Sequence, residues 1–160
     1  MGLKLTGLVM VAVFCAMCGI LMVCRMRSAV SQCEGFRQLI DTLSRRIDCY
    51  RSPLDEIYRD FRNRELEGCG FLPLLREHGM CYALENCTGL HLSHEVIELL
   101  MRFGESLGET GREEQLSHCA YYGGELTRLT GELRSRMPQR SRLYMTLSVA
   151  AGLMLDLLLL

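Results

Sequence analysis

The sequence contains no motif that would assign a catalytic reaction to the chain. The phosphate-binding pattern G-x-x-x-x-G-K-[ST], the H-E-x-x-H pattern of metalloproteases and the G-x-S-x-G nucleophile elbow are all absent. His118 and Cys119 are adjacent in a predicted helix, where neighbouring side chains do not face each other. We therefore expect a protein that is not an enzyme and needs no cofactor.

The sequence also lacks an excess of basic charge and any strand-like alternation. The formal net charge is −1 at pH 7, which gives no positive field for a nucleic acid. No nucleic-acid-binding module is recognisable, so no such partner is expected. Apolar and polar residues do not alternate over the length of a strand. The predicted fold class is therefore all-α.

Two long apolar runs lie at the two ends of the chain. The twenty residues from Leu5 to Cys24, behind a short tail at 1–4, carry no charge. That length crosses a bilayer of ~30 Å as a helix. Arg25 follows directly, which favours a retained anchor over a cleaved signal peptide. The second run, 143–160, has eighteen residues and is at the lower limit of a spanning helix.

Asp156 is the one acidic residue inside the second run. A carboxylate within a membrane helix is costly and is a functional candidate by default. Asp156 is also four residues from the chain end, so its side chain could reach the membrane surface. The alternative is that it faces a membrane helix of a partner.

The distribution of arginine predicts a membrane topology. Seven arginines lie between the two apolar runs and close to them, at positions 25, 27, 37, 134, 136, 140 and 142. On the far side of the runs, toward the two chain ends, the only basic side chain is Lys4. The positive-inside rule then places residues 25–142 in the cytoplasm and both termini across the membrane.

Helical periodicity runs through the segment between the apolar runs. It predicts six helices, at 32–50, from Pro53 onward, at 71–78, at 80–87, from Ser93 to about Leu107, and at about 111–137. Ser52 is the predicted N-cap of the helix that begins at Pro53. The last helix carries a three-four seam that is read as its core face: Leu116, Cys119, Gly123, Leu126, Thr130, Leu133 and Met137. Pro138 should kink or end that helix. The expectation is a bundle of about five to six helices flanked by two transmembrane helices.

A tight corner is predicted between the last two of these helices. Phe103 and Leu107 lie on the apolar face of the first, and Gly108 follows where a left-handed C-cap is expected. Thr110 with Glu113 three residues later is typical of a capping box that starts the next helix.

Nine cysteines are present, and six of them fall in the segment between the apolar runs. Reduced thiols are expected in the cytoplasm, where most would serve as small apolar side chains. The alternative is a metal site, because five candidate ligands lie within seventeen residues: His78, Cys81, Cys87, His91 and His94. Their spacing matches no standard zinc finger or ribbon, so no metal is expected.

The corner carries a pattern with a family resemblance. F-G-x-x-L-G-x-x-x-R-E-x-Q, which comprises Phe103, Gly104, Leu107, Gly108, Arg112, Glu113 and Gln115, resembles the stage III sporulation protein AB family. The order of membrane segment, helical middle and second membrane segment is also similar. Gly111 departs from the family, which more often has a polar residue there. Glycines and Pro138 in the last helix are further departures.

The resemblance implies a structural function. This family resembles the inner-membrane platform protein of type II secretion and type IV pilus systems. It implies a subunit in the mother-cell membrane around the forespore, coupling a secretion-type ATPase to stage III channel proteins. Its other contacts would be membrane lipid and further copies of the chain. The alternative function is a membrane-anchored thiol/His sensor of metal or redox state.

Two residues of the pattern are hypothesised to bind partners. Arg112 and Gln115 fall in the first turns of the last helix, where they do not obviously serve the core. Glu113 is assigned instead to the capping box. We therefore predict that Arg112 and Gln115 present a partner-facing edge.

Overall fold

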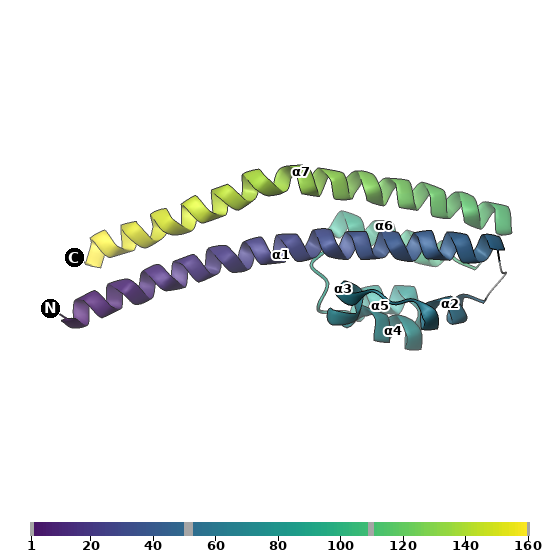
Figure 1. Cartoon of the computed structure of the whole chain (residues 1–160), viewed down its shortest axis with the longest axis horizontal. Helices are drawn as coiled ribbons and strands as arrows, with labels where there is room; N and C mark the ends of the chain where they lie inside the picture. The colour runs from purple at the N-terminus through teal and green to yellow at the C-terminus, as the bar shows by residue number, and fades with distance from the viewer. Residues whose placement is uncertain (1, 50–52, 109–110, 160) are drawn as a thin grey trace. The chain divides into compact units, whose positions relative to one another are not determined.

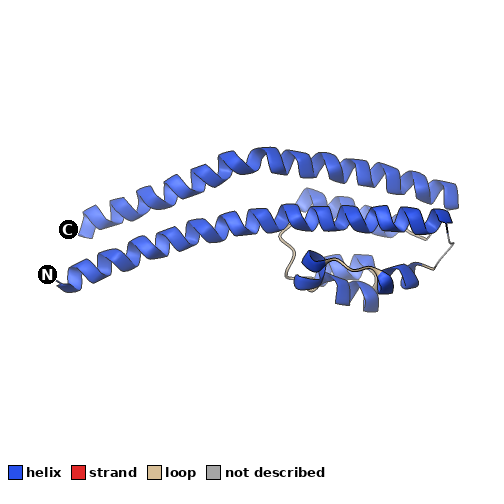
Figure 2. Cartoon of the chain, in the orientation of Figure 1, coloured by secondary structure: helices blue, strands red, loops and turns tan. Residues whose placement is uncertain are grey.

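A computed structural model describes residues 2–49, 53–108 and 111–159, and within them helices joined by loops are the only regular secondary structure (Figures 1 and 2). The seven helices are α1 (Gly2–Cys49), α2 (Leu54–Asp60), α3 (Arg64–Gly68), α4 (Phe71–His78), α5 (Met80–Asn86), α6 (His94–Ser106) and α7 (Arg112–Leu159). The all-α prediction is confirmed.

The chain divides into two compact units. One contains the described parts of Met1–Arg27 and Arg134–Leu160, and the other is Ser28–Leu133. α1 and α7 each contribute to both units, whereas α2 to α6 belong to the second. The second unit holds the chain's main hydrophobic core.

The core of the second unit is built on an apolar stripe of α1, within the helix predicted at 32–50. Phe36 of this stripe packs against Phe71 of α4 edge to face, with ring centroids 4.7 Å apart. The buried members of the stripe are Phe36, Leu39, Ile40, Leu43 and Ile47. Tyr50, the last residue of that predicted helix, lies outside the described residues. Within this unit α1 runs between α7 and the group α2–α5 (Figure 1), so its two sides bury against different partners.

α6 and α7 close the same core. Val96, Leu100 and Phe103 of α6 are fully buried. On α7 the three-four seam contributes Cys119 and Leu126, and a Cβ at Gly123 would stand 3.5 Å from Ile40 of α1. The seam therefore packs inside the chain in this unit.

The short helix α3 was not predicted. Asn63 caps it, because its Oδ1 accepts hydrogen bonds of 3.1 Å from the N–H groups of Glu65 and Leu66. Its Nδ2 donates to Gln38 of α1 at 2.9 Å. α3 contributes a single fully buried side chain, Leu66. Five residues are too few to show helical periodicity, so the bundle holds one helix more than expected.

Two predicted helix boundaries differ from the structure, those at Pro53 and at Pro138. α2 begins at Leu54, and Pro53 holds the cap position with extended backbone angles. Ser52, the predicted N-cap, lies outside the described residues. Ser93 caps α6 as predicted, but its side chain makes no capping hydrogen bond. α7 continues through Pro138, so the prediction that the helix could end there is wrong.

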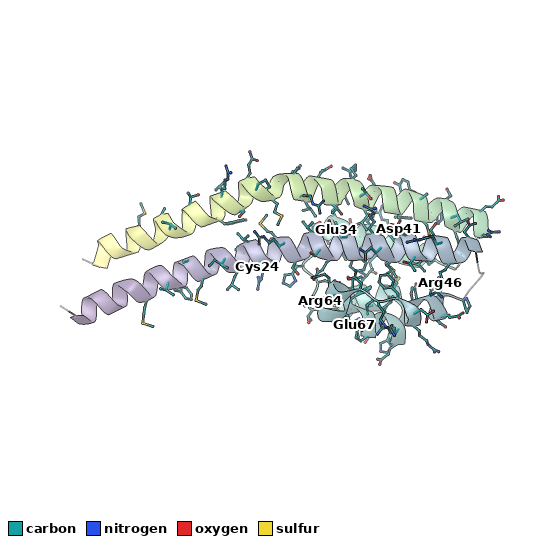
Figure 3. The ribbon with its side chains drawn as sticks, viewed as in Figure 1. Cys24, Glu34, Asp41, Arg46, Arg64 and Glu67 are labelled. Carbon is teal, nitrogen blue, oxygen red and sulfur yellow. The ribbon has the colours of Figure 1, made fainter. Side chains whose placement is uncertain are left out.

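Large apolar side chains are exposed along the first unit. The most exposed are Met10, Phe14, Leu147 and Met154, whose exposed fractions are 75%, 68%, 64% and 77%. The side chains that Figure 3 draws on the N-terminal part of α1 and the C-terminal part of α7 project away from the helices. Among the described residues, no helix meets the length and hydropathy needed to span a membrane.

Candidate functional site

Gly108 ends α6 in the conformation that was expected of it. α6 stops at Ser106, Leu107 is the C-cap, and Gly108 has a φ of 90°. The Leu107 N–H donates to the carbonyl of Gly104 at 3.4 Å. A side chain is strained at this φ, whereas glycine adopts it freely. Residue 108 can therefore take this conformation without strain because it has no Cβ.

Gly104 serves a different purpose, which is close helix packing. A Cβ at this position would lie 3.0 Å from Cys81 Sγ and 3.2 Å from Met80 Cγ. Those atoms belong to the first turn of α5, which packs against α6. A methyl group would be tight there, and the Cys81 and Met80 side chains would have to give by a few tenths of an ångström. The glycine at 104 thus permits the close packing of α5 and α6.

Phe103 and Leu107 attach the corner to the core. Phe103 is fully buried, and its ring is tilted against Tyr122 of α7 at a centroid distance of 5.4 Å. Leu107 is half-buried and packs on the same cluster. The apolar pair therefore binds the end of α6 to α7.

The start of α7 is shifted by one residue from the predicted capping box. Arg112 is the first helical residue, and the carbonyl of Gly111 accepts from the Gln115 N–H at 2.9 Å. This places Gly111 at the cap, so Glu113 is the second helical residue instead of the third. Thr110, the predicted N-cap, lies outside the described residues. Glu113 is exposed and still complements the helix dipole in the first turn.

Arg112 joins the start of α7 to the end of α1. Its Nη2 lies 2.6 Å from Asp48 Oδ1 and donates to the Asp48 backbone carbonyl at 2.5 Å. That carbonyl is in the last turn of α1, where cations are favoured. Both side chains are about half exposed, so solvent screening leaves the ion pair a small net contribution. The guanidinium remains partly accessible.

Gln115 lies one turn further along α7 and is half-buried. Within the described residues, its side-chain amide has no hydrogen-bond partner. The structure therefore places Arg112 and Gln115 in the same first turns of α7, and Arg112 is paired with Asp48.

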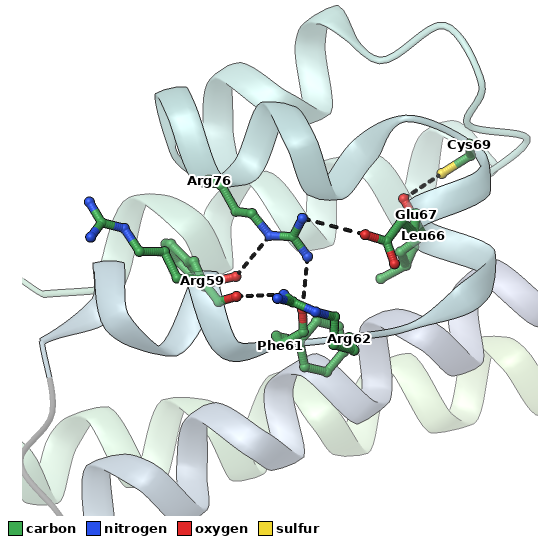
Figure 4. Close-up of polar contacts among 8 residues, drawn as sticks. Arg59, Phe61, Arg62, Leu66, Glu67, Cys69 and Arg76 are labelled. Atoms are coloured by element: carbon green, nitrogen blue, oxygen red, sulfur yellow. Dashed lines mark hydrogen bonds and ion pairs between the residues drawn. The ribbon is translucent and has the colours of Figure 1, made fainter.

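Arg76 is the main polar contact that the sequence did not reveal (Figure 4). Its guanidinium donates to the carbonyls of Tyr58 and Phe61 at 3.4 and 3.0 Å, and it lies 3.5 Å from Glu67 Oε1. The two carbonyls end α2, where orphan acceptors need donors. One side chain of α4 therefore fixes the end of α2 and the end of α3.

Gln32 is a second such residue, and it is the buried polar side chain of α1. It is 2% exposed. Its Nε2 donates to the Gly89 carbonyl at 3.0 Å, and its Oε1 accepts from the His91 N–H at 2.8 Å. This amide holds the loop between α5 and α6 from both sides. Its partners are more than fifty residues away in sequence, which no local pattern could indicate.

The five candidate metal ligands are not brought together. His78 lies against Tyr82, with ring centroids 4.4 Å apart, and His94 lies 4.0 Å from Glu98. His91 Nδ1 is 2.9 Å from the carbonyl of Gly89 in its own loop. In the part of the chain that is described, no three His, Cys, Asp or Glu side chains could jointly hold a metal ion.

Burial keeps the core thiols protonated. It raises the pKa of Cys119 to about 11 and also raises the pKa of Cys33. The pKa of Tyr58 is raised to about 12, again chiefly by burial. These groups are neutral at pH 7 and behave as part of the core.

A family model for stage III sporulation protein AB matches residues 79–160, which is half of the chain. The chain belongs to the stage III sporulation protein AB family. The matched segment comprises α5, α6 and α7, and it contains the whole pattern from Phe103 to Gln115. Membership of the stage III sporulation protein AB family implies a role in the third stage of sporulation. No curated protein and no solved structure matches the chain.

Proposed function

We propose that this chain is a non-enzymatic platform subunit in the mother-cell membrane around the forespore. In this proposal it couples a secretion-type ATPase to the stage III channel proteins. Family membership supports the sporulation role, and the resemblance of the family to secretion platforms supports the coupling role. The second unit supplies the cytoplasmic domain, and the two chain ends supply the anchor.

The observation that carries the membrane proposal is the exposed apolar surface of the first unit. Met10 and Phe14 of α1 and Leu147 and Met154 of α7 would each present most of their surface to water in an isolated chain. Such surfaces are rare on soluble monomers and are typical of sites that contact lipid or protein. Lipid acyl chains would cover them along both predicted runs.

Arginine supports the orientation of the anchor. Arg25 and Arg27 follow the first apolar run, and Arg142 immediately precedes the second. Positive side chains are retained on the cytoplasmic side of a membrane. The second unit would then face the mother-cell cytoplasm, where an ATPase has its nucleotide.

The edge offered to partners is the start of α7. Arg112 is half exposed and already oriented by Asp48, which reduces the entropy lost when a partner carboxylate binds its free donors. The Gln115 amide in the same turns has no hydrogen-bond partner within the described residues. A partner with an acidic and amide-bearing surface fits this pair.

A thiol-labelling experiment tests the topology. Cys33 is fully buried and unsuitable as a reporter, whereas Tyr121 is 65% exposed in the second unit. Tyr121→Cys in the full-length chain should react with a membrane-impermeant maleimide only after cells are permeabilised. The unsubstituted chain gives the background from native thiols.

The same cells test the anchor. The chain should stay in the membrane fraction through alkaline carbonate and leave it only in detergent. Labelling of Tyr121→Cys in intact cells would invert the topology. Release by carbonate would remove the anchor altogether.

A further inference from the structure

Cys69 and Cys87 bring two thiols together at the base of one helical hairpin. Cys69 stands two residues before α4, and Cys87 directly follows α5. The Cys87 thiol donates to the Cys69 carbonyl at 3.2 Å, which places the Cys87 sulfur directly against the Cys69 backbone. Both side chains are partly exposed. The Cys69 thiol also donates to the Leu66 carbonyl (Figure 4).

The backbone around the two thiols is held in close contact. A Cβ at Gly89 would lie 2.3 Å from the Cys69 carbonyl oxygen, so only glycine fits beside the turn. Gln32 fixes the same loop through Gly89 and His91. The proximity of the two thiols is therefore imposed by the fold and does not depend on two free side chains meeting.

A cavity of about 490 Å³ opens next to Cys69. Its lining includes Cys69, Arg64, Thr88 and His91. This volume lies within the range that accommodates a small molecule. A low-molecular-weight disulfide could therefore reach the Cys69 sulfur.

We propose that Cys69 and Cys87 form a dithiol site that oxidises to a disulfide by exchange with a low-molecular-weight disulfide. The Cys69 sulfur attacks one sulfur of the small disulfide, forming a mixed disulfide and releasing one small thiol. The Cys87 sulfur then attacks Cys69 and releases the second small thiol. In total, two electrons and two protons pass from the two protein thiols to the small disulfide, which leaves as two small thiols.

The disulfide would cross-link the base of the α4–α5 hairpin. Closing this loop restricts the unfolded chain and stabilises the fold. The pKa of Cys69 is raised, first of all by burial, which keeps this thiol protonated. Both thiols stay reduced in a reducing cytoplasm. The Cys69–Cys87 disulfide would form only when small disulfides accumulate.

Oxidised glutathione is a suitable probe, applied to the full-length chain in mild detergent. After free thiols are blocked, trypsin should yield Glu65–Arg76 joined to Glu77–Arg102. The linked pair should be lighter by two hydrogens than the two peptides with Cys81 blocked and with Cys69 and Cys87 as free thiols. The melting temperature of the oxidised chain should rise by roughly 10 °C. Excess dithiothreitol should reverse both changes.

Cys81 lies in the second peptide, so variants decide which thiol is linked. Cys81→Ser should retain the cross-link and the thermal shift, and Cys87→Ser should lose both. Cys87→Ala replaces it if Cys87→Ser does not fold by circular dichroism. A cross-link that persists without Cys87 would overturn the proposal. Two separate glutathione adducts, or two thiols left free, would overturn it equally.

Discussion

Two glycines in one short pattern have different physical purposes. Gly104 is needed for space, since a Cβ would meet Cys81 and Met80 of α5 at 3.0–3.2 Å. Gly108 is needed for its backbone conformation, since its φ is 90°. A Cβ added there would have Leu54 as its nearest neighbour, at 3.4 Å. The two glycines are one helical turn apart. One allows α6 to pack closely on α5, and the other allows α6 to end in a left-handed residue.

This difference gives a matched prediction at the residue scale. Gly108→Ala should lower the free energy of unfolding by about 1 kcal/mol, because alanine is strained at positive φ. Gly124→Ala should raise it by about 0.5–1 kcal/mol, because Gly124 is exposed inside α7 with open space around it. Thermal melts of the full-length chain in detergent, followed by circular dichroism, measure both. Equal effects of the same sign would refute the left-handed cap.

Arg112 shows how far a residue's role can be inferred from its pattern. Its position in the first turns of a helix predicted an exposed cation, and it is half exposed. Its ion pair with Asp48 connects residues sixty-four positions apart, which periodicity cannot reveal. The partner-binding hypothesis therefore needs a control that removes the ion pair but leaves Arg112 in place, and Asp48→Asn is that control.

At the scale of elements, the helices with a long apolar stripe were predictable. α6 was predicted from Ser93 to about Leu107 and observed at His94–Ser106. α1 was predicted as an apolar run and a separate periodic helix, and the structure assigns a single helix. α3 was missed because its stability comes from the Asn63 cap and one buried leucine, neither of which gives a periodic signal.

Arg76 provides the element-scale prediction, since it secures the ends of two short helices. Arg76→Met should cost about 1–2 kcal/mol, because two carbonyls at the end of α2 lose a charged donor in a half-buried site. Glu67→Gln removes only the ion pair and should cost at most about 0.5 kcal/mol. The two melting temperatures are compared in the same detergent. Indistinguishable values would show that the contacts with the α2 carbonyls do not contribute.

At the scale of the whole molecule, composition and order along the chain predicted more than single sites did. The sequence predicted the two apolar runs, the helices between them and the family pattern, because each is a repeated or contiguous feature of the sequence. The contacts of Gln32, Arg76 and the Cys69–Cys87 pair were not, because they join segments that meet only after folding.

Affinity capture tests the platform claim most directly. The full-length chain is captured from sporulating cells in mild detergent, with Arg112→Glu plus Gln115→Lys as the edge variant and Asp48→Asn as its control. The secretion-type ATPase should co-purify with the unsubstituted chain and with Asp48→Asn, and at least tenfold less should co-purify with the edge variant if its melting curve is unchanged. Unreduced capture by the edge variant would remove the edge from the interface. Absence of the ATPase from the unsubstituted capture, with the chain intact in the membrane fraction, would contradict the platform account.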